Sequence, residues 1–140
     1  MPAVTFSVPG NPVPQPRPRV ATRGGFARAY VPSSHPVHAY RRAIADTARV
    51  HGVNVSDGAV AVELRFTFER PKSHRTKTGI KATAPTLPRE DVDNLAKACL
   101  DGLTCVAWHD DKQVADLHAT KQYGDEGKTE VTIHELPADV

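Results

Sequence analysis

Two aspartates separated by one residue, with a lysine shortly after them, are the side chains of this sequence best suited to chemistry. They are Asp91 and Asp93, and Lys97 follows four residues after the second of them. If residues 90–93 are extended, both carboxylates point to one face, where their mutual repulsion calls for a cation. Mg²⁺ accepts one or two carboxylates and keeps several waters, and Mn²⁺ also prefers carboxylate oxygens.

The same segment also has an ordinary structural interpretation. Asp93 or Asn94 can be the N-cap of a helix, and Asp91 is favourable near the positive end of a helix. In a helix that follows, Lys97 would lie one turn after Asp93 and could reach back toward it. The spacing alone leaves both interpretations open.

A second acidic pair, Asp110 and Asp111, follows Trp108 and precedes a predicted strand. Paired aspartates in a turn often serve only the turn. Delivered from a second element, however, a third carboxylate would complete an oxygen-rich metal site. Three carboxylates and a lysine suit phosphodiester hydrolysis, in which metal ions activate water and the lysine adds positive charge near the phosphate.

The elements that must position these residues indicate one α+β domain over residues 1–140. Alternating apolar residues predict strands at 3–8, 60–68, 113–122 and 129–135, of which the last two would form a hairpin. Apolar stripes predict helices from Pro36 to about Gly52 and at about 94–103. Residues 90–93 and 106–108 should be extended, and the tail from Pro137 should fray.

Composition limits the class of protein. The 140 residues are the size of one domain, and no apolar stretch or leader pattern indicates a membrane segment, so we expect a cytoplasmic protein. Cys99 and Cys105 lack zinc or disulfide spacing, which indicates free thiols. The histidines are too scattered for a zinc site, and without a glycine-rich nucleotide loop we expect no organic cofactor. The seven histidines are at positions 35, 38, 51, 74, 109, 118 and 134.

Charge is distributed unevenly along the chain. Residues 1–45 carry +6, residues 46–88 carry +3 and residues 89–140 carry −7, which together give the net +2. A basic half favours a polyanion and an acidic half favours divalent cations, although solvated surfaces alone could give the same pattern.

Three motifs in a fixed order resemble the RusA family of endodeoxyribonucleases. They are DVDNLAK at residues 91–97, LDGL at 100–103 and WHDDKQV at 108–114. The opening PGNPVP at 9–14 and the RPR at 17–19 are also similar to many members. The resemblance therefore spans nearly the whole chain.

The resemblance implies a homodimeric, Mg²⁺-dependent nuclease of DNA recombination and repair that cuts four-way (Holliday) junctions. It also implies a mixed sheet of about four to five strands packed with two main helices. Family catalytic positions correspond to Asp91, Asp93, Lys97 and Asp111, with the three aspartates as metal ligands and Asp110 in a supporting or turn role. A nuclease for flaps or forks, and a DNA-binding module without catalysis, remain alternatives.

One position departs from the family pattern. Members often carry a basic residue or proline directly before the first aspartate, whereas this chain has Glu90, with Arg89 one place earlier. Strand alternation would point Glu90 away from Asp91, so we expect only a modest disturbance.

Basic side chains in two proline-rich segments are candidate contacts to DNA phosphates. The prolines of residues 10–33 and 70–88 disfavour regular elements, and the second segment is free of acidic residues, so we predict basic loops, the second one mobile. Such contacts position DNA without reading its sequence, and solvated loops are the alternative. The candidates are Arg17, Arg19, Arg23, Lys72, Arg75, Lys77 and Arg89.

Overall fold

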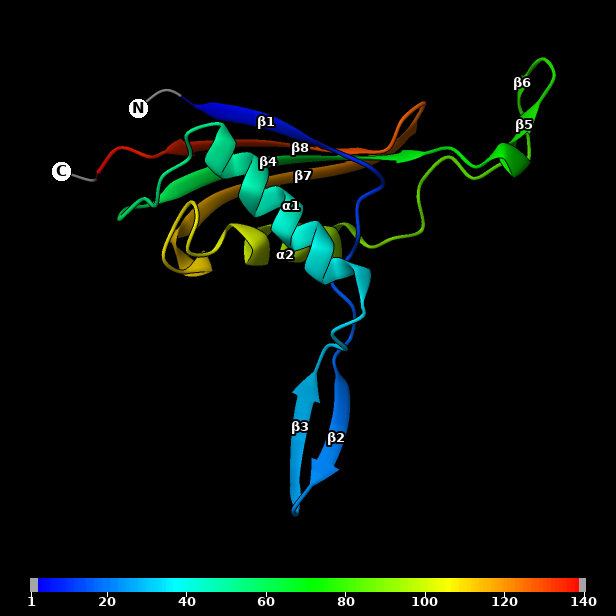
Figure 1. Ribbon diagram of the computed structural model, residues 1–140. Helices are drawn as coiled ribbons and strands as arrows, with labels where there is room; N and C mark the ends of the chain where they lie inside the picture. Colours follow the sequence, from blue (N-terminus) through cyan, green and yellow to red (C-terminus); the bar gives the residue numbers. More distant parts are fainter. Residues whose placement is uncertain (1–2, 139–140) are drawn as a thin grey trace.

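A four-stranded mixed sheet forms the centre of the computed structural model, which describes residues 3–138. The strand order is β1-β8-β4-β7, with β4 antiparallel to β8 and parallel to β7 (Figure 1). This arrangement confirms the predicted α+β class with a mixed sheet. The strands are β1 (Val4–Pro9), β4 (Val60–Glu69), β7 (Val114–Gly124) and β8 (Lys128–Glu135).

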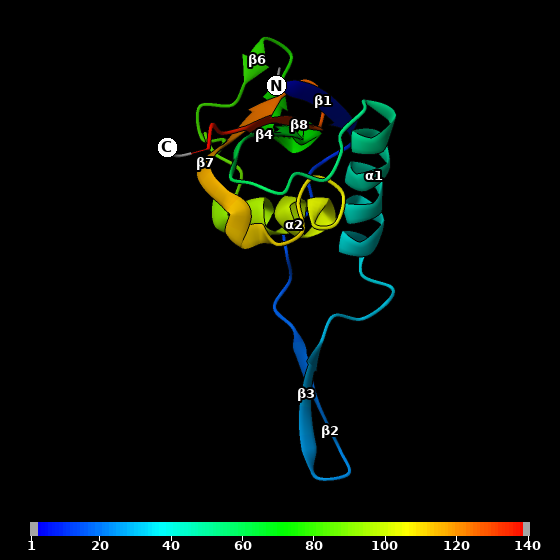
Figure 2. The same cartoon turned by 90° about the vertical axis from the view of Figure 1, so that its left-hand side faces the viewer.

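Two helices, α1 (Pro36–Val50) and α2 (Val92–Leu103), cover one face of the sheet (Figure 2). The buried core lies between this face and the helices. Its largest fully buried side chains include Trp108, Phe66, Ile44, Leu64 and Leu95. The other sheet face carries no helix in the described part of the chain. The predicted pair of main helices is confirmed by α1 and α2.

The predicted boundaries of α1 are confirmed by its caps. His35 is the N-cap, and its Nδ1 accepts a hydrogen bond from the Val37 N–H at 3.0 Å, while Pro36 holds the first helical position. At the other end Gly52 has a φ of 83°, a left-handed conformation that glycine adopts without strain.

The central strand β4 follows the predicted alternation, but its neighbours differ from the prediction. Val62, Leu64 and Phe66 are buried, whereas Glu63 and Arg65 are exposed. The predicted hairpin of the last two strands is wrong, because β7 and β8 lie on opposite sides of β4. Both strands pair with β4, whose apolar residues are buried at the centre of the sheet.

Residues 20–33 do not form the predicted loop. Strands β2 (Arg19–Arg23) and β3 (Phe26–Tyr30) form a hairpin that stands away from the body (Figures 1 and 2). Gly24 and Gly25, with φ of 62° and 83°, make the two-residue turn. A Gly-Gly pair supplies the positive φ that such a turn requires at both positions, and this signal was present in the sequence.

The basic segment 70–88 contains more structure than a predicted loop. It forms a short 3₁₀ turn, η1 (Lys72–His74), and a small hairpin of β5 (Arg75–Thr76) and β6 (Gly79–Ile80). Residues 106–108 are also not extended as predicted, since 105–107 form a turn and Trp108 bridges to Ser56 and Thr104.

Residues 1, 2, 139 and 140 lie outside the described part of the structure. Of the tail predicted to fray from Pro137, residues 139 and 140 lie outside the described part. Among residues 3–138, no helix combines the length and apolar character needed to span a membrane.

Candidate active site

Asp91 and Asp93 lie at the start of α2 rather than on a strand. The prediction that residues 90–93 are extended is wrong from Val92 onward, because α2 begins there and Asp93 is already helical. Asp91 is the N-cap, yet its carboxylate accepts no hydrogen bond from the helix in the described structure. The Asp93 carboxylate accepts one from the Asn94 N–H at 3.0 Å. The exposed carboxylate of Asp91 is therefore not used as a helix cap.

A cavity of about 220 Å³ brings three of the four predicted catalytic residues together. Asp93 and Lys97 reach it from α2, and Asp111 reaches it from the turn before β7. Asp91 is absent from its lining. The apolar part of the wall consists of Ala96, Leu100 and Leu117.

The turn that carries Asp111 is held by one side-chain amide, that of Gln113. Its Oε1 accepts hydrogen bonds from the N–H groups of His109 and Asp110 at 2.8 and 3.1 Å. Its Nε2 donates to the carbonyls of Ser56 and Gly58 at 2.8 and 2.9 Å. Gln113 therefore fixes the turn to a loop more than fifty residues earlier in the chain.

Asp110 supports this turn, as predicted for the first member of the pair. Its carboxylate accepts a hydrogen bond from the Lys112 N–H at 2.9 Å and completes a capping box with Gln113. This hydrogen bond from the backbone N–H lowers the pKa of Asp110 below its ordinary value. Asp110 is thereby committed to the turn, while Asp111 lines the cavity.

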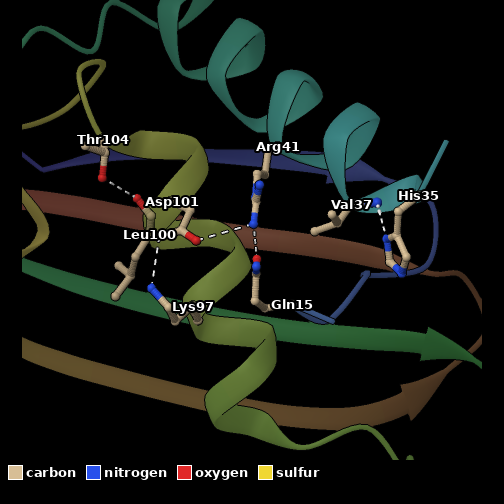
Figure 3. A network of polar contacts seen from close by, with 8 residues as sticks. All are labelled: Gln15, His35, Val37, Arg41, Lys97, Leu100, Asp101 and Thr104. Carbon is tan, nitrogen blue, oxygen red and sulfur yellow. Dashed lines mark hydrogen bonds and ion pairs between the residues drawn. The ribbon is translucent and has the colours of Figure 1, made fainter. Parts of the chain in front are cut away.

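Lys97 belongs to a network of polar contacts that links both helices (Figure 3). Its Nζ lies 3.3 Å from Oδ1 of Asp101, and Oδ2 of Asp101 lies 3.4 Å from the Arg41 guanidinium. Arg41 also donates to the side chain of Gln15. The sequence places Asp101 inside the LDGL motif but assigns it no task, and its partner on α1 could not be identified from sequence spacing.

The donor set of the cavity suits a hard divalent cation. Among residues 3–138, no three acidic, histidine or cysteine side chains are close enough to hold a metal together. Asp93 and Asp111 nevertheless offer two carboxylates to one cavity. Mg²⁺ commonly takes one or two carboxylates and completes its shell with water and substrate phosphate. A set of three aspartate ligands stays a prediction.

Three residues near the aspartates, His109, Trp108 and Glu90, have contacts of their own. His109 is exposed, with its Nε2 2.8 Å from Oδ1 of Asp57. Trp108 is fully buried, so it belongs to the core. Glu90 does not follow strand alternation as predicted, because no strand forms there; its carbonyl accepts a hydrogen bond from Lys121 Nζ at 2.9 Å.

The predicted phosphate contacts lie in both basic segments and, for Arg89, directly after the second one. Arg17, Lys72, Arg75, Lys77 and Arg89 are exposed, and Arg75 also pairs with Asp125 at 3.6 Å. Arg19 and Arg23 belong to β2, but their side chains lie outside the described part of the structure.

Comparisons with known proteins agree with the motifs in this site. The uncharacterized protein YqaN of Bacillus subtilis (strain 168) is 32% identical over 145 residues, which cover 99% of this chain and 100% of that protein. A family model described as endodeoxyribonuclease RusA matches residues 9–134, a range that includes Asp91, Asp93, Lys97 and Asp111. The chain therefore belongs to the RusA endodeoxyribonuclease family.

Proposed function

We propose that this chain is a Mg²⁺-dependent endodeoxyribonuclease that resolves four-way DNA junctions by paired, symmetric hydrolysis of phosphodiester bonds. One observation carries the proposal. Asp93, Lys97 and Asp111 line one cavity in a chain that the RusA family model matches almost throughout. We expect Mn²⁺ to substitute for Mg²⁺, because both prefer carboxylate oxygens.

The residues of the site have two roles in this proposal. The carboxylates of Asp91, Asp93 and Asp111 would hold the metal, which would supply activation of water and neutralisation of charge on the phosphate. Lys97 supplies an ammonium group that stabilises negative charge on the attacked phosphate or the leaving oxygen. Its ion pair with Asp101 restrains the ammonium group before DNA arrives.

The proposed substrate explains the basic segments and requires two sites. Exposed cations at Arg17, Lys72, Lys77 and Arg89 would hold the phosphates of the junction arms, and binding should weaken steeply with salt. Two incisions related by symmetry need two copies of the cavity, so we propose a homodimer with two-fold symmetry. Sedimentation of the protein with and without a junction would measure the dimer directly.

The test is cleavage of a synthetic four-way junction in Mg²⁺, beside linear duplex, flap and fork substrates. We expect paired symmetric nicks in the junction alone. Asp91→Asn and Asp111→Asn should lose cleavage while they still bind the junction, and Lys97→Ala should cut about 100-fold more slowly. The matched control is Asp116→Asn, which changes an exposed aspartate of β7 outside the cavity and should leave the rate unchanged.

Each alternative function has its own result in this assay. Equal or faster cutting of flaps or forks would keep the nuclease and refute junction specificity. Tight binding without cleavage in Mg²⁺ or Mn²⁺ would instead make the chain a DNA-binding module. If Asp91→Asn cuts normally while Asp111→Asn does not, Asp91 is not part of the site.

A further inference from the structure

A second and larger cavity lies where the basic segment 70–88 meets the ends of β4 and β7. Its volume is about 430 Å³, within the ~300–1,000 Å³ typical of pockets for small ligands. Its walls combine apolar or aromatic side chains with a few polar ones, the usual composition of a ligand pocket. The apolar residues are Phe68, Pro71, Pro85, Leu87 and Tyr123, and the polar ones are Asn11, Glu69, His74, Arg89 and Glu90.

The aromatic wall of this cavity is fixed by its neighbours. The Arg70 guanidinium carbon lies 4.4 Å from the centre of the Tyr123 ring, and Arg70 also donates to the Pro85 carbonyl at 2.8 Å. The His74 ring meets the Tyr123 ring edge to face, with centres 5.6 Å apart. These contacts join the basic segment to β7 and hold two walls of the cavity together.

The rim of the cavity favours a flat ligand that carries phosphate. Leu87 is 58% exposed although it lines the cavity, so a large apolar surface is available there. Arg89 lines the same cavity, and the basic segment next to it contains Lys72, Lys77 and Lys81 with no acidic residue. A ligand with an apolar flat part and a negatively charged backbone matches both features.

We infer that this cavity binds one nucleobase of the DNA substrate, turned out of the helical stack at the branch point. The inference rests on the proposed function. Apolar walls would contact the faces of the base, and the carboxylates of Glu69 and Glu90 can accept hydrogen bonds from an amino group on its edge. Thymine, which lacks an amino group, is the base that fits least well.

The cavity lies close to the candidate active site along two elements. Arg89 and Glu90 directly precede Asp91 in sequence. On β7, Leu117 lines the active-site cavity and Tyr123 lines the second one, which separates them by about 20 Å at ~3.3 Å per residue. At ~3.4 Å per nucleotide that distance spans about six nucleotides of duplex. With the base held at the branch point, the cut phosphate would therefore lie within about six nucleotides of it.

A base pocket beside the cutting site gives a physical reason for branch selectivity. Turning a base out of a continuous duplex costs free energy for lost pairing and stacking, and this cost is smallest where pairing is already weakened. A junction offers such bases at its centre, whereas a linear duplex does not. Filling the pocket should therefore weaken binding to junctions more than binding to duplex.

The experiment compares Leu87→Trp, which fills the cavity, with Ile80→Trp as the matched control. Ile80 is 55% exposed and lies on β6 in the same segment, but it does not line the cavity. The dissociation constant is measured by fluorescence anisotropy, without divalent metal, for a four-way junction and a linear duplex. We expect Leu87→Trp to weaken junction binding about fivefold or more and to leave duplex binding equal to that of Ile80→Trp.

Junctions that each lack a single base near the branch locate the contact. At one position, the missing base should weaken junction binding by the unsubstituted protein by the same factor as Leu87→Trp does. Leu87→Trp itself should bind that junction no more weakly than it binds the intact one. The inference is overturned if Leu87→Trp binds junctions like Ile80→Trp, or if the two losses multiply at every position. Normal junction cleavage with either result leaves the proposed function intact, whereas failure to bind or cut any branched DNA overturns both.

Discussion

Replacing Gln113 tests whether the turn that carries Asp111 must be held in place for catalysis. Its amide makes four hydrogen bonds that hold the turn carrying Asp111 against the carbonyls of Ser56 and Gly58. Gln113→Leu keeps the approximate size of the side chain and removes all four bonds. We expect the turn to loosen and Asp111 to leave its position in the cavity.

The expected loss of stability follows from the exposure of these bonds. Taking about 1 kcal/mol for the part-buried bond to Ser56 and about a third of that for each of the three exposed bonds gives about 2 kcal/mol. With an unfolding entropy of about 2.1 cal/mol/K per residue, 140 residues convert this into a Tm lower by about 7 °C. A displaced carboxylate should also slow cleavage about 100-fold, measured well below the Tm.

Gln122→Leu is the matched control for this prediction. Gln122 lies on β7, the strand that follows the turn, but makes its hydrogen bonds with Arg65 and Thr67. We expect its Tm to fall by no more than about 2 °C and its cleavage rate to stay unchanged. Equal Tm losses for both variants would refute the anchoring of the turn. A large Tm loss for Gln113→Leu with normal cleavage would refute its role in positioning Asp111.

Three further predictions concern helix packing, acid stability and the thiols. A Cβ at Gly102 would lie 3.0 Å from the Arg41 carbonyl oxygen, so Gly102→Ala should cost about 1–3 kcal/mol, visible as a lower Tm. The lowered pKa of Asp110 stabilises the fold above the ordinary aspartate pKa, and this stabilisation is lost as the pH falls through the folded-state value. The Tm deficit of Asp110→Ala should therefore be present at neutral pH and shrink below about pH 4; a constant deficit would contradict the linkage. Burial raises the pKa of the Cys99 thiol to about 12, whereas Cys105 is exposed, so a thiol reagent should label one cysteine in the folded protein and two after unfolding.

The elements that could be predicted from the sequence are those with a strong period and clear ends. In β4, Val62, Leu64 and Phe66 alternate with exposed charged residues. A period of two residues is typical of a strand and not of a helix. In α1, the capping His35 and the following Pro36 mark the first turn, and both are local signals. Local signals of this kind are independent of how the strands pair.

Two of the wrong predictions concern strand pairing and a helix boundary. The strands β7 and β8 are neighbours in sequence, but each pairs with β4, because pairing depends on contacts between distant segments that one sequence does not display. The segment at Asp91 and Asp93 is acidic enough for either a strand face or the first turn of a helix. The helix begins at Val92, where acidic residues are favoured by the helix dipole.

The LDGL motif shows why part of the site was hidden in the sequence. A Cβ at Gly102 would lie 3.0 Å from the Arg41 carbonyl oxygen, so the absence of a side chain there lets the backbone of Arg41 approach α2. That approach brings the Arg41 guanidinium within reach of Asp101, whose other carboxylate oxygen faces Lys97 (Figure 3). Two consecutive residues of α2 thus connect the packing of the helices to the orientation of Lys97. Asp101 and Arg41 are sixty residues apart, so this connection exists only in the folded chain. A substitution that separates the two helices should therefore free Asp101 from Arg41 and leave Lys97, its partner within α2, as the cation that it pairs with.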